Sequence, residues 1–188
     1  MAAAGEVVAQ MHSACRARLA PGVTTGELDA VARDVLADAG ATSNFLGYHG
    51  FPAVICASVN DEVVHGIPGP RVIDDGDIVS IDCGAVVDGW HGDAAFTAGV
   101  GEISAADRTL INAGKASLDA GLGQARLGRS VGDIGFAVSA VSRAAGFAQL
   151  EDHGGHGIGR EMHEEPSIPN AGRPGDGPSL KPGMVLAI

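Results

Sequence analysis

The chain has 188 residues, of which 45% are apolar and 4% aromatic, enough for one buried core. Its formal net charge is −11 and its lysines and arginines form no cluster, so we expect no nucleic-acid partner, because phosphate binding needs concentrated positive charge. Three cysteines without a CxxC pair indicate reduced thiols, and no run of about 18 apolar residues or signal peptide is present. Composition therefore predicts a cytoplasmic protein that neither spans a membrane nor is secreted.

The first part of the chain predicts two helices and a strand. The first helix spans residues 5–18 and ends before Pro21-Gly22. The second begins at Thr24, because Thr24 and Glu27 have the spacing of a capping box. Its apolar side chains recur at helical spacing, at Leu28, Val31, Ala32, Val35 and Leu36. Residues 53–65 then predict a strand.

The remaining elements continue a mixed α and β pattern. Asp88-Gly89 favours a two-residue turn, so it predicts a β-hairpin over residues 77–98. Ser104 and Asp107 indicate the start of a third helix, which runs to about residue 120. The other expected elements are a helix over 131–145, a loop with five prolines over 164–183, and a strand in the last six residues. This pattern places the chain in the α+β class.

Two segments of the chain resemble each other, which predicts an internal repeat. Residues 26–40 align with residues 132–146, a shift of 106 positions, with four identities and two similar pairs. An HGI triplet follows each segment, and each triplet is followed by a glycine that opens a strand. The common order of these elements predicts two related halves.

The hairpin carries two aspartates that we expect to share one face of the sheet. With Asp88-Gly89 as the turn, Gly84 pairs with Asp93 and Asp82 pairs with Ala95, which makes Asp82 and Asp93 diagonal neighbours about 7–8 Å apart. Two like charges at this distance need a shared proton or a cation, and two metal ions about 3.5–4 Å apart would neutralise both. Gly84 and Gly92 are expected to leave room beside the pair. The alternative is a pair of structural aspartates on a solvent-facing surface.

A second group of candidate residues lies in the segment GGHGIGREMHEEP. His156 stands among four glycines, which are expected to let another group approach its ring, and His163 follows seven residues later. The spacing is not that of the HExxH zinc motif, and neither a GxSxG nucleophile motif nor a P-loop lysine occurs. From the sequence alone, we interpret Cys56 and Cys83 as small buried hydrophobic side chains.

Three motifs in this order resemble those of the type I methionine aminopeptidase family. They are VVHGIP at 63–68, the aspartate pair ending in DGWHGDAA, and GHGIGREMHEEP at 155–166. The resemblance runs from near residue 5 to the end of the chain. It implies a pita-bread α+β fold with two pseudo-symmetric halves. It also implies an enzyme that removes the initiator methionine from new proteins whose second residue is small.

The resemblance also assigns roles to individual residues. It implies that Asp82, Asp93 and His156 bind two divalent metal ions, which could be Co²⁺, Mn²⁺, Fe²⁺ or Zn²⁺, and that a metal-bridging hydroxide attacks the substrate. His65 and His163 would contact the scissile amide as catalytic and substrate-binding residues. The pocket for the methionine side chain would be lined by Tyr48, Phe51, Cys56 and Met162. The implied partners are the N-termini of nascent polypeptides and a ribosome that presents them, with the enzyme acting as a monomer.

The resemblance further implies residues that this sequence does not contain. The family's ligand set has five members, and one of its two glutamates would directly follow Ile188. We therefore expect residues 1–188 to form a single catalytic-type domain that is C-terminally truncated, with its second half incomplete and without its last strands and both glutamates. Three ligands are too few to fill two coordination shells, so we expect weak metal binding and low or absent activity.

Two other functions remain open from the sequence. A related pita-bread peptidase would cleave Xaa-Pro bonds, although VVHGIP favours the methionine aminopeptidases. A non-catalytic peptide-binding module on the same fold would retain the pocket without the chemistry. The presence of all three metal-type side chains argues against this module, and a Mn²⁺ titration would distinguish the two.

Overall fold

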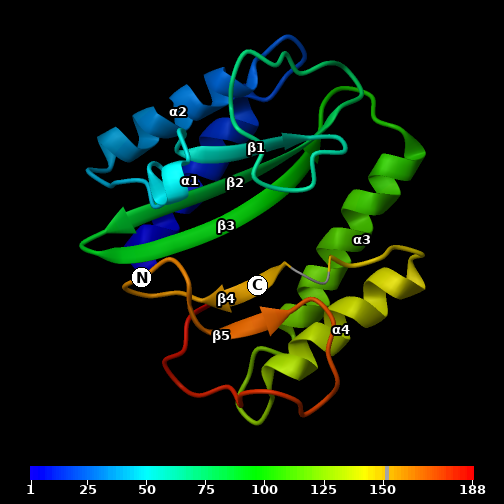
Figure 1. Cartoon of the computed structure of the whole chain (residues 1–188). Coiled ribbons are helices and arrows are strands. Elements are labelled where there is room, and N and C mark those ends of the chain that lie inside the picture. The colour runs from blue at the N-terminus through cyan, green and yellow to red at the C-terminus, as the bar shows by residue number, and fades with distance from the viewer. Residues whose placement is uncertain (151–152) are drawn as a thin grey trace. The chain divides into compact units, whose positions relative to one another are not determined.

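The computed structural model describes residues 1–150 and 153–188, which form two compact units. The N-terminal unit comprises Met1–Arg108 together with Arg160–Met162. The C-terminal unit comprises Thr109–Gly159 together with His163–Ile188. Each unit contains its own three-stranded antiparallel sheet (Figure 1).

The N-terminal unit places two helices against one antiparallel sheet. Its helices are α1 (Ala2–Arg18) and α2 (Thr25–Asp38), and its strands are β1 (Ile55–Val59), β2 (Ile78–Val87) and β3 (Trp90–Gly99) in the order β1-β2-β3. A single 3₁₀ turn, η1, covers Tyr48–Gly50. Helix α1 packs on β2 and β3, and α2 packs on α1 and β1 (Figure 1). These contacts bury one face of the sheet.

The core of the N-terminal unit forms on the face that the alternation of β2 predicts. Side chains at every second position of β2 are fully buried, namely Val79, Ile81, Cys83 and Ala85. They pack with apolar side chains of the two helices, among them Val8, Met11, Cys15, Leu28 and Ala32. The other face of the sheet therefore remains available for polar side chains.

The hairpin has the predicted turn and register. Asp88 and Gly89 adopt φ values of 51° and 72°, the left-handed conformation that a two-residue hairpin turn requires. Val87 pairs with Trp90, Gly84 with Asp93 and Asp82 with Ala95. The diagonal placement of the two aspartates is thereby confirmed.

Helix α2 begins with the predicted capping box and carries a buried carboxylate that the sequence analysis missed. The Thr24 hydroxyl accepts from the Glu27 amide, and the Glu27 carboxylate accepts from the Thr24 amide at 2.8 Å. Asp29, only 8% exposed, accepts the amides of Val54 and Ile55 at 2.7 and 3.2 Å. This carboxylate thus attaches the start of β1 to α2.

The C-terminal unit places helix α4 against a second sheet. Helix α3 spans Ala105–Leu122 and α4 spans Val131–Ala144, while the strands β4 (Gly154–Gly157), β5 (Glu164–Pro169) and β6 (Leu186–Ala187) pair in the order β5-β4-β6. Helix α4 packs on β5, and the small core contains Val131, Ile134, Ile168 and Leu180.

The structure confirms the internal repeat at the level of helix boundaries. Helix α4 begins and ends 106 residues after α2, since 25 and 38 become 131 and 144. A second capping box joins Ser130 and Asp133, at the positions equivalent to Thr24 and Glu27. The repeat was predicted from four identities, and the second capping box is an independent observation that supports it.

Two predicted segments differ from the structure. The strand expected over 53–65 is confined to Ile55–Val59, because Asn60 and His65 adopt positive φ and end the extended run. The loop expected over 164–183 contains strand β5, whose prolines are tolerated because β5 lies at an edge of its sheet. The strand expected in the last six residues is limited to Leu186–Ala187.

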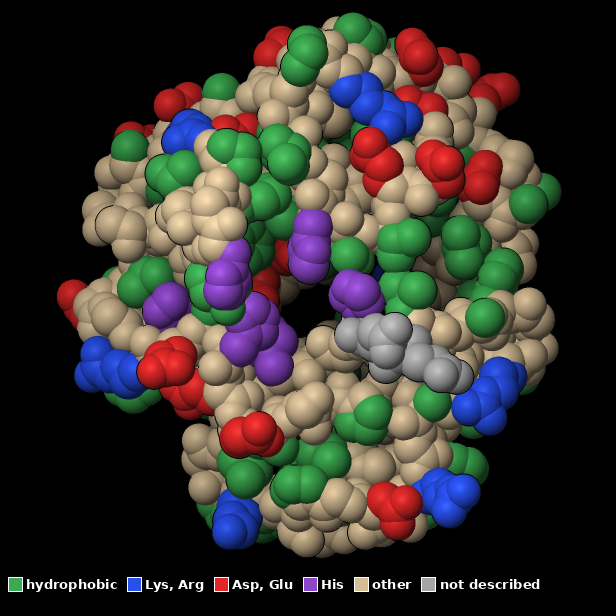
Figure 2. Space-filling view, viewed as in Figure 1, with side chains coloured by type: hydrophobic (Ala, Val, Ile, Leu, Met, Phe, Trp, Pro, Cys, Tyr) green, Lys and Arg blue, Asp and Glu red, His purple; other side chains and the backbone are tan. Residues whose placement is uncertain are grey.

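On the face shown in Figure 2, Lys and Arg side chains are scattered rather than gathered into one patch. Within residues 1–150 and 153–188, no helix has the length and apolar character needed to cross a membrane.

Replacing Asp29 tests how β1 is attached to α2. The variant Asp29→Ala should lower the free energy of unfolding by about 2–3 kcal/mol, because two buried amides lose a charged acceptor. Urea denaturation measures this change. Asp34→Ala, an exposed change on the same helix, is the matched control and should stay within about 0.5 kcal/mol of the parent. Equal effects of both variants would contradict the role of Asp29.

The capping box of α2 predicts a dependence of stability on acid. The Thr24 amide and hydroxyl, and then Arg18, lower the pKa of Glu27 from 4.5. A carboxylate with a lowered folded pKa stabilises the fold above its unfolded pKa, and this contribution disappears as the pH falls through the folded value. The melting temperatures of the parent and Glu27→Gln should differ most at neutral pH and converge as the pH falls below 4.5, the ordinary pKa of this carboxyl. A constant difference over this range would contradict the prediction.

Candidate functional site

The N-terminal unit presents a polar face on the side of the β2–β3 hairpin opposite its core. Asp82 and Asp93 are half-buried there, and the hydroxyls of Ser80 and Thr97 bond across the strands at 2.7 Å. Cys56 on β1 lies directly opposite Asp82 in the sheet register. We call this side, carrying Asp82, Gly84 and Asp93, the acidic face.

The charge of the acidic face is evident in its effect on Cys56. Burial, together with the charges of Asp82 and Asp93, raises the pKa of the Cys56 thiol to about 12. Both carboxylates therefore act on one buried thiol. At neutral pH Cys56 is protonated and behaves as a small apolar side chain.

The two hairpin glycines have different roles from the one predicted. Gly92 lies on the opposite face, where an added Cβ would be 3.0 Å from the carbonyl carbon of Ala4 in α1. Gly84 does lie on the acidic face, but the space beside it is filled by the Asn44 side chain, with which a Cβ at Gly84 would collide. The expectation that both glycines leave room beside the aspartates is therefore wrong. Gly92 contacts α1 on the opposite face, and the space beside Gly84 is filled by Asn44.

An apolar cluster adjoins the acidic face through Cys56. Phe45, Cys56 and Met162 are buried together, and Phe51 packs against them. Three of these four are predicted pocket residues, whereas Phe45 was missed because no local pattern distinguishes it from other apolar loop residues. The fourth predicted residue, Tyr48, is 43% exposed and lies outside this cluster, with its ring 4.4 Å from that of His49.

Met162 is held in the N-terminal unit by its neighbour Arg160. The Arg160 guanidinium donates to the carbonyl oxygen of Asp88 at 2.9 Å and lies 3.9 Å above the Trp90 ring. Both contacts are made at the hairpin turn. They anchor the short Arg160–Met162 segment to the unit that carries the acidic face.

His65 is placed by close contact between its segment and β1. It adopts a φ of 60°, and the following Gly66 accepts the Ala57 amide at 2.9 Å and donates to Ser58 Oγ at 3.0 Å. A Cβ at Gly66 would collide with the carbonyl oxygen of Ala57, so this position requires glycine. The imidazole of His65 is exposed beside the strand that carries Cys56.

In the C-terminal unit, His156 and His163 lie against each other. Their ring centroids are 4.3 Å apart, at an interplanar angle of 57°. His156 Nδ1 is 2.9 Å from the Gly157 carbonyl oxygen, and because a carbonyl only accepts, Nδ1 carries the proton. In the neutral ring Nε2 then holds the lone pair, the form in which histidine binds a metal ion.

The glycines around His156 serve the packing of strands rather than access to the ring. A Cβ at Gly154 or Gly155 would collide with the carbonyl oxygen of Ile168 or Ala187, respectively. Gly157 is similarly close to Glu165. The neighbouring strands therefore occupy the space that was expected to admit another group.

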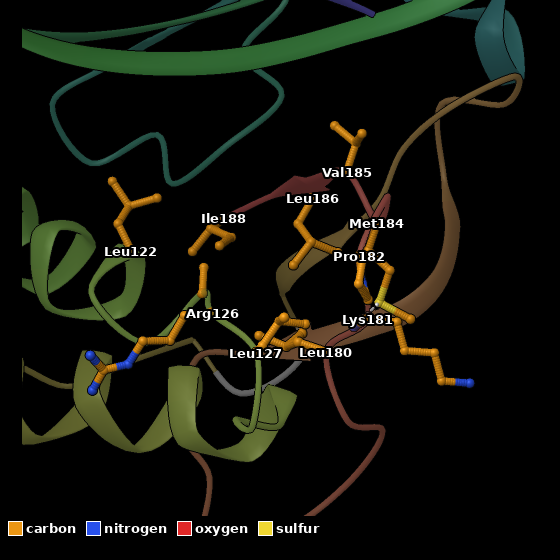
Figure 3. Close-up of a pocket in the computed structure, with 11 residues that line it drawn as sticks. Leu122, Arg126, Leu127, Leu180, Lys181, Pro182, Met184, Val185, Leu186 and Ile188 are labelled. Atoms are coloured by element: carbon orange, nitrogen blue, oxygen red, sulfur yellow. Dashed lines mark hydrogen bonds between the residues drawn. The ribbon is translucent and has the colours of Figure 1, made fainter.

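The C-terminal unit also contains an apolar pocket of about 440 Å³ (Figure 3). It is formed by the end of α3, the turn after it and the last segment of the chain, and its lining includes Leu122, Leu127, Leu180, Met184 and Ile188. None of the predicted site residues lines it. We therefore do not assign the candidate active site to this pocket.

The predicted metal ligands are divided between the two units. Asp82 and Asp93 belong to the N-terminal unit, and His156 belongs to the C-terminal unit. Among the described residues, no three His, Cys, Asp or Glu side chains gather at metal-binding distances. The assignment of these three ligands remains a prediction.

Comparisons with known proteins agree on one family. Residues 1–188 match the model of metallopeptidase family M24. The chain is 53% identical to methionine aminopeptidase 1 of Mycobacterium tuberculosis (strain CDC 1551 / Oshkosh) and 46% identical to methionine aminopeptidase 1 of Bacillus subtilis (strain 168). In both cases all of this chain is covered, with 73% and 76% of the relatives' lengths.

Solved structures extend the comparison to the fold. The methionine aminopeptidase of Thermotoga maritima has a TM-score of 0.97 and 37% identity, with 99% of this chain and 75% of that chain covered. The prolidase of Pyrococcus furiosus has a TM-score of 0.85 and 23% identity, with 98% and 52% covered, which is a likeness of fold alone.

The contact of Gly66 with β1 can be tested by adding one methyl group. Gly66→Ala should lower the free energy of unfolding by about 1–3 kcal/mol, because the backbone of Ala57 must move. Hydrogen exchange should show faster exchange of the Ala57 amide, which bonds to Gly66. Gly69→Ala is the control in the same loop, since a Cβ there meets nothing within 4 Å. Normal exchange at Ala57 in Gly66→Ala would contradict the assigned contact.

Proposed function

Because the chain belongs to metallopeptidase family M24 and is closely related to its methionine aminopeptidases, we propose that it removes the initiator methionine from nascent polypeptides whose second residue is small. The observation that carries this proposal is the buried apolar cluster of Phe45, Cys56 and Met162 beside the two carboxylates of the acidic face. A thioether side chain fits such a cluster, and a peptidase needs the carboxylates for its metal ions.

We propose that Asp82, Asp93 and His156 hold the divalent ions that the family implies. The donor set fits, since carboxylate oxygens and a neutral imidazole nitrogen suit Mn²⁺, Fe²⁺, Co²⁺ or Zn²⁺. Two carboxylates on one face also favour a cation between them. When bound, such ions supply Lewis acidity, which polarises a carbonyl and acidifies water.

The remaining assigned residues would bind and orient the substrate. The apolar cluster would hold the methionine side chain and exclude water from it, with Tyr48 at its exposed margin. His163 would donate a hydrogen bond to the scissile carbonyl oxygen, on which negative charge develops. His65 would hold a proton for the leaving amine. The substrate preference for a small second residue would follow from limited space next to the scissile bond.

The family resemblance favours this function over cleavage of Xaa-Pro bonds. The methionine aminopeptidase structures of Rickettsia prowazekii and Thermotoga maritima are 36% and 37% identical to this chain, whereas the Xaa-Pro dipeptidase of Bacillus anthracis is 25% identical. The three candidate ligands offer few donors for two ions, so we propose that this chain binds metal weakly and turns over slowly.

A peptide assay tests the activity. With Mn²⁺ or Co²⁺ added, the chain should release methionine from Met-Ala-Ser more than about 100-fold more slowly than the Mycobacterium tuberculosis relative does. Met-Leu-Ser, with a large second residue, is the matched control and should not be cleaved. Turnover equal to that of the relative would contradict the weak activity. Release that persists after the metal is chelated would contradict a metal-dependent reaction.

A thermal-shift experiment tests the metal site independently of turnover. Mn²⁺ should raise the melting temperature of the parent, because an ion that binds only the folded state stabilises it. Asp82→Asn and Asp93→Asn should each lose this shift. Asp61→Asn, an exposed change in the same unit, should retain it. A full shift in both site variants would contradict the assigned ligands.

A further inference from the structure

One buried amide on the acidic face has an acceptor without a protein partner. Asn44 is 7% exposed, and its Nδ2 donates to the Gly92 carbonyl oxygen at 3.3 Å. This bond fixes the orientation of the carboxamide, because only Nδ2 can donate to a carbonyl. Its Oδ1 is buried and accepts no hydrogen bond from the described residues. Buried polar atoms are nearly always satisfied, so a donor from outside the protein is expected here.

The orphaned oxygen lies on the face of the hairpin that carries the two carboxylates. Asn44 Oδ1 lies against Gly84, at the point where a Cβ of residue 84 would be. Gly84 pairs with Asp93 across the hairpin and stands two positions from Asp82 on the same face. The glycine is thus a cradle for the carboxamide beside the carboxylate pair.

The position of Asn44 is set by its backbone and not by chance packing of a mobile loop. Two residues earlier, Thr42 and Val86 exchange backbone hydrogen bonds of 3.1 and 2.7 Å at the edge of β2. The Ser43 hydroxyl accepts the amides of Phe45 and Leu46 at 3.0 and 3.1 Å. The segment is therefore attached on both sides of Asn44.

The nearby side chains leave a ligand as the expected donor, since none of them donates to Asn44 Oδ1. This includes His91, which pairs with Val86 on the same face. Carboxylates accept hydrogen bonds rather than donate them, and of the Ser80 and Thr97 hydroxyls one donates to the other while neither donates to Asn44 Oδ1. Asn44 Oδ1 is a further electron-rich oxygen on the face that already carries two carboxylates. It therefore raises the electrostatic free energy of the site when no cation is bound. A cation on this face would bind the two carboxylates. A water molecule coordinated by that cation would be polarised and would donate a hydrogen bond to Asn44 Oδ1.

We propose that Asn44 is a positioning residue of the metal site, whose Oδ1 accepts a hydrogen bond from a water molecule held by the divalent ion on the acidic face. This inference rests on the proposed metal site of Asp82 and Asp93. It predicts that Asn44 contributes to metal affinity through its oxygen and not through its bond to Gly92. Second-layer contacts of this kind hold coordinated groups in place.

Two substitutions in the full chain separate the role of the Asn44 oxygen from that of its bond to Gly92. The probe is Mn²⁺ alone. Its binding is followed by calorimetry and by the electron paramagnetic resonance of free Mn²⁺. Asn44→Ala should weaken Mn²⁺ binding by about 10–100-fold. Asn44→Asp keeps an acceptor oxygen but cannot donate to Gly92, and because it also adds a negative charge beside the two carboxylates, it should bind Mn²⁺ at least as tightly as the parent. If Asn44 acted only through Gly92, the aspartate variant would bind Mn²⁺ as weakly as the alanine variant, and the proposal would be overturned.

Further variants keep the test independent of folding. Gly84→Ala leaves Asn44 in the chain but displaces its oxygen, so it should also weaken Mn²⁺ binding. Ser117→Ala is the control, because the Ser117 hydroxyl is likewise buried without a hydrogen-bond partner among the described residues but belongs to the C-terminal unit. It should bind Mn²⁺ as the parent does. The metal-free Asn44→Ala protein should melt somewhat lower than the parent, because it loses the bond to the Gly92 carbonyl and the packing on Gly84, so thermal unfolding of each variant without metal shows that it still folds.

The outcomes distinguish this inference from the proposed function. If the parent binds Mn²⁺ and Asn44→Ala binds it equally well, Asn44 has no role at the metal site and only this inference fails. If the parent binds no Mn²⁺, the proposed metal site fails and this inference fails with it. Weaker binding in Asn44→Ala and Gly84→Ala, with retention in Asn44→Asp and Ser117→Ala, would establish the positioning role.

Discussion

The pairing of β2 with β3 is the constraint on which the candidate site depends. Because side chains alternate along a strand, a register fixed by the Asp88-Gly89 turn decides which residues enter the core and which face outward. A shift of one residue would bury Asp82 against α1 and expose Ile81. The apolar side chains of β2, packed on two helices, oppose such a shift and so hold the aspartates on the acidic face. The stability of the core and the geometry of the site are thus two consequences of one register.

The sequence predicted those parts of the fold that local chemistry determines. Three features depend only on residues close together in the sequence, and all three were confirmed. They are the hairpin turn with its positive φ values, the capping box of Thr24 and Glu27, and the alternation of β2. Asn44 and Phe45 were missed because their neighbours come from other segments of the chain, Gly84 for Asn44 and Cys56 and Met162 for Phe45. Asp29 was missed for the same reason, since its partners are the amides of Val54 and Ile55. Contacts between distant segments leave no periodic signal.

The glycines show most clearly what a single sequence leaves open. Their number predicted close approaches of backbone, and the approaches exist, but the approaching group differed from the expected one in several places. At Gly92 it is helix α1, at Gly155 it is strand β6, and only at Gly84 is it a polar side chain on the acidic face. A glycine indicates that another group approaches the backbone closely, but it does not identify that group. The partner becomes known only from the fold, because it comes from another element.

The likeness to the Pyrococcus furiosus prolidase, at 23% identity, shows that this fold occurs in enzymes whose names indicate other substrates. The fold therefore cannot by itself specify methionine. What can specify it are side chains beside the carboxylates, and in the N-terminal unit these are the apolar cluster and the protonated thiol of Cys56. Burial, and to a smaller extent the two carboxylates, raises the pKa of that thiol and keeps it uncharged. The apolar character of this neighbour therefore rests mainly on burial and not on the charge that would attract a cation.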